Sequence, residues 1–515
     1  MGVIRRQGIK HSIINYIGVL IGAFSTFYIY QLTDTTWAFY GLAQGIVNSA
    51  MLLLPFATLG VTSLIIRFFP DFKEENNHHN GFLSFLLVAL SISMTVFFVV
   101  GWFFSDKLLA GLHTLGFDVE PFQKHGLAVI AICVLVSYAA VFDNFAKNFK
   151  RITVQSIFTY LLPKLALPTI ILLLYWGYLD EIQAANCLPL FYFVGMVGLI
   201  GYVIALRQMN LRPKFSFLTK ERLFLMGNYA LYGIIGSLGS MLALRIDSIM
   251  VLSLVGDSPN AIYSNAFFMA NVIAIPGNSI IAISSPIIAQ SIAKSDMANV
   301  EAIYKKSSLT LGAVGLGIYL LIGISIDELF GLMPKGDAAS LGKWVFFMIG
   351  ASKVIDLLTS VNGLIISYSK YYRFNLVAIC ILAVLNVFMN YFLIKTLDLG
   401  INGAALATLI SLSLYNIVKL LFIWIRLKVQ PFTRNTLQLF LIFAFVFATA
   451  QIIPAISFTQ IGGKLNYFLT VILKSILCGS LFVVTLFFTR TAPELNQVFF
   501  HYYGNFKDWW KSKLG

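Results

Sequence analysis

Apolar segments of about 20 residues recur along the whole sequence, and they limit the folds open to this chain. A helix rises about 1.5 Å per residue, so about 20 residues cross a hydrocarbon core of roughly 30 Å. Hydrophobic residues make up 58% of the chain and charged residues only 11%, against roughly 25% charged residues in a soluble domain. The sequence therefore predicts an all-α polytopic membrane protein.

We expect fourteen transmembrane helices, with boundaries set by the apolar runs. They lie near residues 11–31, 38–66, 81–104, 125–145, 154–176, 185–206, 223–255, 261–289, 307–326, 342–366, 374–394, 402–425, 437–455 and 466–489.

The positive charges indicate the orientation of these spans. If the N-terminus is cytoplasmic, 25 of the 36 lysines and arginines fall on cytoplasmic segments and only a few on external loops, which is the positive-inside bias. We predict that both termini are cytoplasmic and that the first apolar segment is a retained span, since no A-x-A site follows it. The net charge of +14 thus reports topology and not nucleic-acid binding.

Motifs for soluble chemistry are missing from the sequence. It has no Walker A, H-E-x-x-H, G-x-S-x-G or paired C-x-x-C pattern, so we predict no catalytic residues. His78 and His79 are adjacent and point apart, and no ligand set completes them, so we predict no metal site. The four cysteines lie in or beside spans, which argues against a disulfide framework.

The spans suggest two halves and an addition. Residues 1–206 form an expected N-terminal six-helix lobe, and residues 207–425 form a second one. Residues 426–515 add two spans and a cytoplasmic interfacial tail. Because an even number of crossings separates the first and seventh spans, any repeat is parallel, about an axis along the membrane normal.

Asparagines and small residues form stripes within several spans. In the first span, Asn15 shares a helical face with Gly18 and Ser25; in the eighth, Asn271 shares one with Asn278 and Ser285. Such stripes suit close helix packing or a water-filled lumen, and both interpretations stay open. The expected polar lumen positions are Asn15, Asn48, Asn271 and Asn278.

Charges deep inside spans need a partner or water, because each costs about 2.5–3.5 kcal/mol at the bilayer centre. Two charges lie near cytoplasmic ends: Lys419 can snorkel toward the surface, and Asp143 can pair with Lys147 four residues later. Six lie about 15–20 Å from a span end. This deep set comprises Lys164, Arg245, Asp247, Lys353, Asp356 and Lys474.

The deep set contains four cations and two anions. An excess of cations suits an anionic ligand, to which Arg offers a bidentate fork and Lys a mobile point charge, whereas a cationic ligand should select the opposite bias. We therefore predict substrate binding by the four cations Arg245, Lys353, Lys164 and Lys474. Asp247 and Asp356 are candidates for helix pairing or for coupling to H+ or Na+.

Arg245 and Asp247 are two residues apart, so their side chains should point about 200° apart on a helix. Asp247 shares its face with Gly233 and Gly236, which favours helix packing or coupling. Arg245 lies on another face and suits either substrate contact or a buried ion pair between helices.

Three segments resemble a known family. "GINGAALATLIS" (400–411) and "RIDSIMVLSLVGDSPNAIYSNA" (245–266) resemble polysaccharide transporters of the multidrug/oligosaccharidyl-lipid/polysaccharide (MOP) superfamily, and "GIKHSIINYIGVLIGAFSTFYIY" (8–30) is similar to the start of Wzx-like O-antigen flippases. The resemblance implies two six-helix lobes facing a central cavity.

The same resemblance implies a function and a location. It implies a flippase that moves undecaprenyl-pyrophosphate-linked oligosaccharide across the bacterial inner membrane, in contact with membrane lipid and other polysaccharide-assembly membrane proteins, with no cofactor beyond a coupling ion. The alternatives are a multidrug or lipid II exporter of the same superfamily, or a membrane-embedded glycan polymerase or ligase. The short loops argue against the last.

Overall fold

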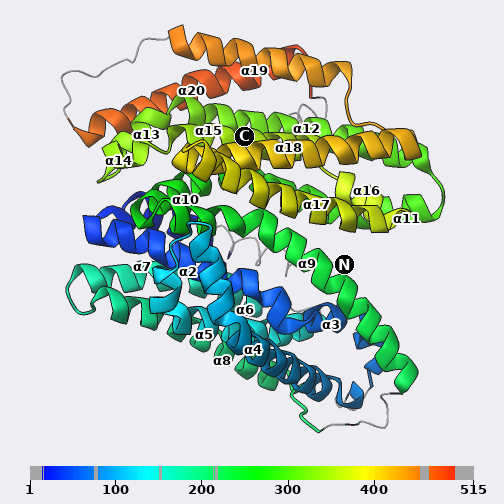
Figure 1. The fold of residues 1–515 in the computed structure, drawn as a ribbon. Helices are drawn as coiled ribbons and strands as arrows, with labels where there is room; N and C mark the ends of the chain where they lie inside the picture. Colours follow the sequence, from blue (N-terminus) through cyan, green and yellow to red (C-terminus); the bar gives the residue numbers. More distant parts are fainter. Residues whose placement is uncertain are drawn as a thin grey trace, which may run out of the picture. The chain divides into compact units, whose positions relative to one another are not determined.

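All elements that the structure describes are helices (Figure 1). The structure is a computed structural model, and it describes residues 14, 17–74, 79–149, 153–212, 214, 219–452 and 463–492. Nine of the helices in these ranges are long and apolar enough to cross a membrane, or eleven if each of two bent pairs is one span. Two shorter apolar helices, Ile17–Gln31 and Arg434–Ala450, lie where we expect the first and thirteenth spans. The chain is thus an all-α, multi-pass membrane protein, and the number fourteen stays a prediction.

Residue contacts divide the chain into two units, which we describe separately. The first contains residues 1–264 and 386–404, and the second contains residues 265–385 and 405–515. The predicted lobes 1–206 and 207–425 and the addition 426–515 rest on a possible repeat of six spans. They stay a prediction.

The first unit contains the helices up to α9, the helix η6, and parts of α10, α17 and α18. Its elements are η1 (Ile29–Gln31), α2 (Asp34–Thr58), α3 (Val61–Phe72), η2 (His79–Gly81), α4 (Phe82–Thr114), α5 (Glu120–Lys147), α6 (Thr153–Ser156), η3 (Ile157–Leu161), α7 (Leu162–Tyr175), α8 (Glu181–Ala205), α9 (Lys220–Leu254), the start of α10 (Asp257–Asn271), the end of α17 (Tyr372–Tyr391), η6 (Phe392–Thr396) and the start of α18 (Gly400–Leu427).

The second unit contains the rest of α10, α17 and α18. Its other elements are η5 (Val272–Ala274), α11 (Ile275–Ala293), α12 (Met297–Ile324), α13 (Ile326–Leu332), α14 (Gly336–Ser340), α15 (Lys343–Thr359), α16 (Asn362–Tyr368), α19 (Arg434–Ile452) and α20 (Lys464–Phe488).

Local sequence explains where α2 begins and ends. Thr33 caps its N-terminus: its hydroxyl accepts the Thr36 N–H, and the Thr36 hydroxyl accepts the Thr33 N–H in return. The helix stops at Leu59 and Gly60, whose φ values of 42° and 75° are left-handed. The second predicted span, 38–66, is therefore wrong as one helix, because this turn separates α2 from α3.

Glycines let α2 pack closely in the first unit. A Cβ on Gly41 would lie 1.9 Å from the backbone oxygen of Asp257, and one on Gly45 would lie 2.1 Å from the Leu252 side chain. The backbones of α2 and the α9–α10 turn thus approach one another as only glycine allows.

Two further predicted spans are broken. The eighth, 261–289, consists of α10, the 3-10 turn η5 and α11, with Pro276 in the first turn of α11. The tenth, 342–366, divides into α15 and α16, bent by 47°. The break falls at Ser360, whose φ of 34° is left-handed. Each of these two spans is therefore bent, and the polar stripe Asn271–Asn278–Ser285 does not follow one straight helix.

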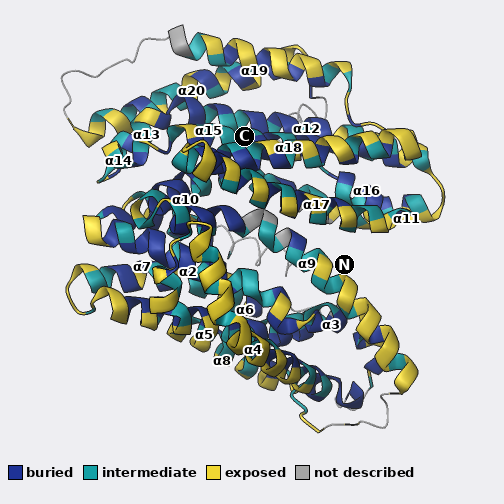
Figure 2. Cartoon of the chain, viewed as in Figure 1, coloured by how far each residue is buried: buried dark blue, intermediate teal, exposed yellow. Residues whose placement is uncertain are grey.

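Exposed residues recur along several helices (Figure 2), and many of them are large and apolar. Trp102 on α4, Val384 on α17 and Phe488 on α20 are 83%, 71% and 78% exposed. Exposure of this kind along apolar helices suits contact with lipid.

Candidate functional site

Arg245 of the first unit forms a hydrogen bond with α2. Its Nη1 atom donates to the Asn48 Oδ1 atom at 2.6 Å. Asn48 is 8% exposed and Arg245 is half-buried, so α2 and α9 share a polar contact within an apolar interior. The structure therefore brings together two of the predicted site residues.

Lys164 adds a second cation to this place. It lies on α7 next to Pro163, its charge interacts with that of Arg245, and its Cγ atom lies 3.8 Å from the position of a Cβ on Gly18. The Lys164 side chain is exposed. We define Lys164, Arg245 and Asn48 as the cationic site. Because like charges held close together repel, an anion that bridges them is stabilised.

Asp247 makes a different set of contacts and is only 3% exposed. Its Oδ2 atom accepts the Tyr263 hydroxyl at 2.9 Å, and its Oδ1 atom accepts the Asn390 amide at 2.8 Å. The Asn390 amide also donates to Asn386, and the Asn390 Oδ1 atom has no partner among the described residues. We define Asp247, Tyr263, Asn386 and Asn390 as the Asp247 network.

In the second unit, Asn416 of α18 forms hydrogen bonds with both parts of the broken tenth span. Its Oδ1 atom accepts from Thr359 at 3.0 Å and from Asn362 at 3.2 Å, one residue on each side of the break. Its amide donates to Asp356 at 3.3 Å. Asp356 is exposed within an apolar helix, which suits a position in contact with water.

Lys353 precedes Asp356 by one turn and is 8% exposed. Its ammonium lies 5.6 Å from the centre of the Phe267 ring, a cation–π contact. Two predicted site residues thus lie on α15 with different surroundings.

Lys474 on α20 forms a salt bridge with Glu328 on α13. The side chains are 20% and 12% exposed, and the Lys474 ammonium also donates to the Ile324 backbone oxygen at 3.3 Å. This pair joins α20 to α13. Sequence reasoning missed Glu328, which lies just outside the ninth predicted span, 307–326.

The two charges expected near the cytoplasmic surface have different outcomes. Lys147 and Asp143 form the predicted pair at 2.6 Å. The prediction that Lys419 snorkels is wrong: Lys419 is 5% exposed and lies over the Tyr415 ring at 4.4 Å, with its ammonium 3.3 Å from the Tyr415 hydroxyl. Tyr415 precedes it by one turn, so the sequence contained that signal.

The predicted lumen asparagines are divided between the two units. Asn48 belongs to the cationic site, while Asn271 is half-buried at the end of α10 and Asn278 is exposed on α11. Asn15 lies outside the described residues.

Both ring nitrogens of His79 are hydrogen-bonded. The Nε2 atom lies 2.7 Å from the Gln208 Oε1 atom, and the Nδ1 atom accepts the Glu74 N–H at 3.3 Å. His78 lies outside the described residues. Within the described ranges, no group of His, Cys, Asp and Glu side chains could hold a metal, and the four cysteines are free.

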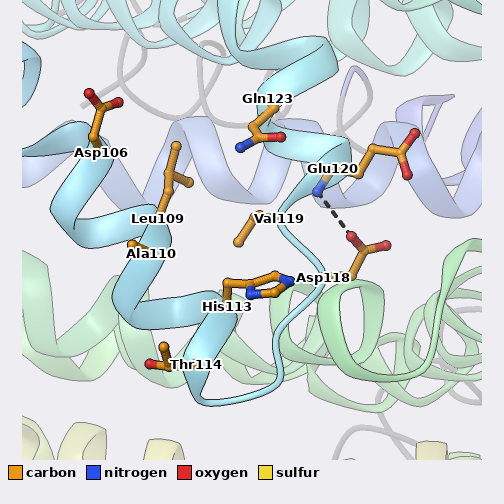
Figure 3. A pocket seen from close by; sticks show the side chains of 9 residues that line it. All are labelled: Asp106, Leu109, Ala110, His113, Thr114, Asp118, Val119, Glu120 and Gln123. Carbon is orange, nitrogen blue, oxygen red and sulfur yellow. Dashed lines mark hydrogen bonds between the residues drawn. The ribbon is translucent and has the colours of Figure 1, made fainter.

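One pocket lies at the turn between α4 and α5 (Figure 3). Asp106 and His113 line it from α4, and Asp118 and Glu120 line it from the start of α5 and the preceding turn. The Asp118 carboxylate accepts the Glu120 N–H at 2.9 Å. The pocket is acidic and contains none of the predicted site residues.

Sequence reasoning missed the partners that complete these polar sites. Asn390, Asn416 and Glu328 lie 143, 60 and 146 residues from Asp247, Asp356 and Lys474, respectively. No local pattern connects residues so far apart. For the asparagines, a polar side chain in an apolar helix was the available signal.

One family model matches much of the chain. The family model described as "Polysaccharide biosynthesis protein" matches residues 6–292, more than half of the chain. None of the curated proteins matches the sequence.

Solved structures show the same fold at low sequence identity. A structure of the lipid II flippase MurJ in an inward closed conformation has a TM-score of 0.67 at 14% identity, covering 93% of this chain and 99% of MurJ. Inward-facing and outward-facing structures of a multidrug resistance MATE family transporter of the MOP superfamily have TM-scores of 0.56 and 0.53, both at 14% identity. They cover 84% and 83% of this chain, and 99% and 95% of the transporter.

Proposed function

The chain belongs to the polysaccharide biosynthesis protein family, and from that premise we propose that it is a flippase for undecaprenyl-pyrophosphate-linked oligosaccharide. It works in the bacterial inner membrane with both termini cytoplasmic, and it carries repeat units for O-antigen, capsule or exopolysaccharide. Transport proceeds by alternating access, and the chain itself makes or breaks no covalent bond.

The cationic site is the observation that carries this proposal. Lys164 and Arg245 are two interacting positive charges in the first unit, and Arg245 donates to the side-chain oxygen of Asn48. A pyrophosphate supplies two adjacent anionic groups, which match a guanidinium fork and a nearby ammonium. The sugars need hydrogen-bonding surroundings, whereas the lipid chain can stay in the bilayer.

The Asp247 network is our candidate site for binding the coupling ion. A carboxylate, the orphaned Asn390 Oδ1 atom and the adjacent Asn386 side chain provide oxygen ligands of the type that hard cations such as Na+ prefer. A proton on the Asp247 carboxylate is the other form of coupling. Asp356, in contact with Asn416, is the corresponding candidate in the second unit.

Deletion of the gene tests the function. We expect loss of surface glycan with normal growth and unchanged drug resistance. A requirement for growth would favour a lipid II exporter, for which the fold of MurJ gives a reason, and drug sensitivity would favour a multidrug exporter. Single repeat units displayed on the external leaflet would favour a polymerase or ligase and would contradict the proposal.

A further inference from the structure

An apolar groove runs between α17 and α18 in the second unit. Its walls follow one helical face on each side, at spacings of three and four residues. The lining residues are Phe374, Val377, Ala378, Ile381, Leu382, Leu385, Ser411, Leu414, Tyr415 and Val418.

Small side chains create the groove. Ala378 and Ser411 are 5% and 0% exposed and form its floor, whereas Val377 and Ile381 are 56% and 61% exposed at its rim. Large side chains at the two floor positions would fill the space. From Phe374 to Leu385 the groove is about 16 Å long, which is about half of a hydrocarbon core.

One end of the groove is basic and aromatic. Lys370 and Arg373 are exposed there, and their charges lie 5.2 Å and 5.8 Å from the rings of Tyr371 and Tyr372. Phe374, in the lining, stacks on Phe422 at 3.7 Å. The sequence has no Asp or Glu from 357 to 397 or from 399 to 493. This end therefore favours an anionic group at a membrane surface.

We propose that this groove seats the hydrocarbon chain of the lipid-linked substrate, with its phosphate end at Lys370 and Arg373. In the orientation that the positive-inside rule gives, that end is cytoplasmic, in the leaflet where the substrate is made. A single groove between two helices seats one chain, and a polyprenyl phosphate has one chain where a phospholipid has two. The inference rests on the proposed function and adds a docking place outside the cationic site.

Photolabelling of the full-length protein in phosphatidylcholine nanodiscs tests the groove. The probe is a polyprenyl monophosphate with a diazirine on its chain, and labelled peptides are identified by mass spectrometry. We expect labels within residues 374–385 and 411–418, and a matched diazirine phosphatidylglycerol should label them much less. Labelling elsewhere, or equal labelling by phosphatidylglycerol, would overturn the proposal.

Substitutions distinguish the groove from its surroundings. Ala378→Leu should reduce labelling about tenfold, since each methylene excluded from an apolar site weakens binding severalfold. Val384→Leu, on the same helix outside the lining, should leave it unchanged. If the leucine variant fails to fold, Ala378→Val is the smaller substitution that tests the same position. Lys370→Ala with Arg373→Ala should weaken labelling by the phosphate probe but not by its uncharged polyprenol.

Transport separates this inference from the proposed function. If the wild-type protein restores glycan export in a deletion strain and Ala378→Leu exports normally, the groove proposal fails and the function stands. If the wild-type protein does not move lipid-linked saccharide but the groove is labelled, the function fails and the groove remains a lipid site.

Discussion

Arg245 and Asp247 are two residues apart on α9, and their side chains bond to different helices. Arg245 donates to Asn48 on α2, whereas Asp247 accepts from Asn390 on α17. The two charges therefore belong to separate sites, and a change in one should leave the other intact.

Arg245→Ala should reduce surface-glycan export about tenfold or more, because a hydrogen bond to a charged group is worth about 1.5–3 kcal/mol. Arg245→Lys keeps the charge but loses the fork and should be intermediate. Arg222→Ala, near the start of the same helix, is the matched control. Export is measured in a deletion strain at equal protein levels in the membrane, and full export by Arg245→Ala would exclude a substrate contact.

Asp247→Asn should remove the dependence of transport on the coupling ion, since the carboxylate charge is lost. Transport into vesicles is measured across sodium and pH gradients. Asp257→Asn, at the start of α10, is the control. Unchanged ion dependence in Asp247→Asn would contradict the assignment. Asp247→Leu should also destabilise the protein by about 1–3 kcal/mol, because Tyr263 and Asn390 lose their acceptor.

Lys474→Leu should destabilise the protein because it leaves the carboxylate of Glu328 without its salt-bridge partner. A fully buried pair loses about 3–5 kcal/mol when one partner is removed, and the cost here should be smaller because the side chains are 20% and 12% exposed. Adding Glu328→Leu should recover much of the stability in thermal unfolding. If the double variant is stable and exports no glycan, Lys474 contacts substrate; normal export would assign it a structural role.

Gly41→Ala should cost about 1–3 kcal/mol through overpacking, because the added Cβ would lie 1.9 Å from the Asp257 backbone oxygen. Gly101→Ala on α4 is the control, since nothing lies within 4 Å of its added Cβ. Glycine is unfavourable inside a helix, so this control should stabilise the protein by about 0.5–1 kcal/mol. Unfolding in detergent measures both, and equal effects would contradict the close approach of α2.

Much of the fold could be predicted from the sequence, because the length of an apolar run and the geometry of a helix are local properties. The spans follow from hydrophobic runs, the Asp143–Lys147 pair follows from spacing along one helix, and the separate directions of Arg245 and Asp247 follow from the helical turn.

What the sequence did not predict depends on distant contacts or on backbone turns. The burial of Lys419 in the second unit and the role of Asn390 in the Asp247 network depend on how helices pack. The break at Ser360 uses a residue other than glycine with a positive φ, so composition did not mark it.

The most direct measurement is the leaflet in which lipid-linked repeat units accumulate in a deletion strain. We predict complete undecaprenyl-pyrophosphate-linked units on the cytoplasmic leaflet, cleared by the wild-type chain and not by Arg245→Ala. Repeat units that reach the external leaflet at the normal rate without the protein would contradict the flippase function.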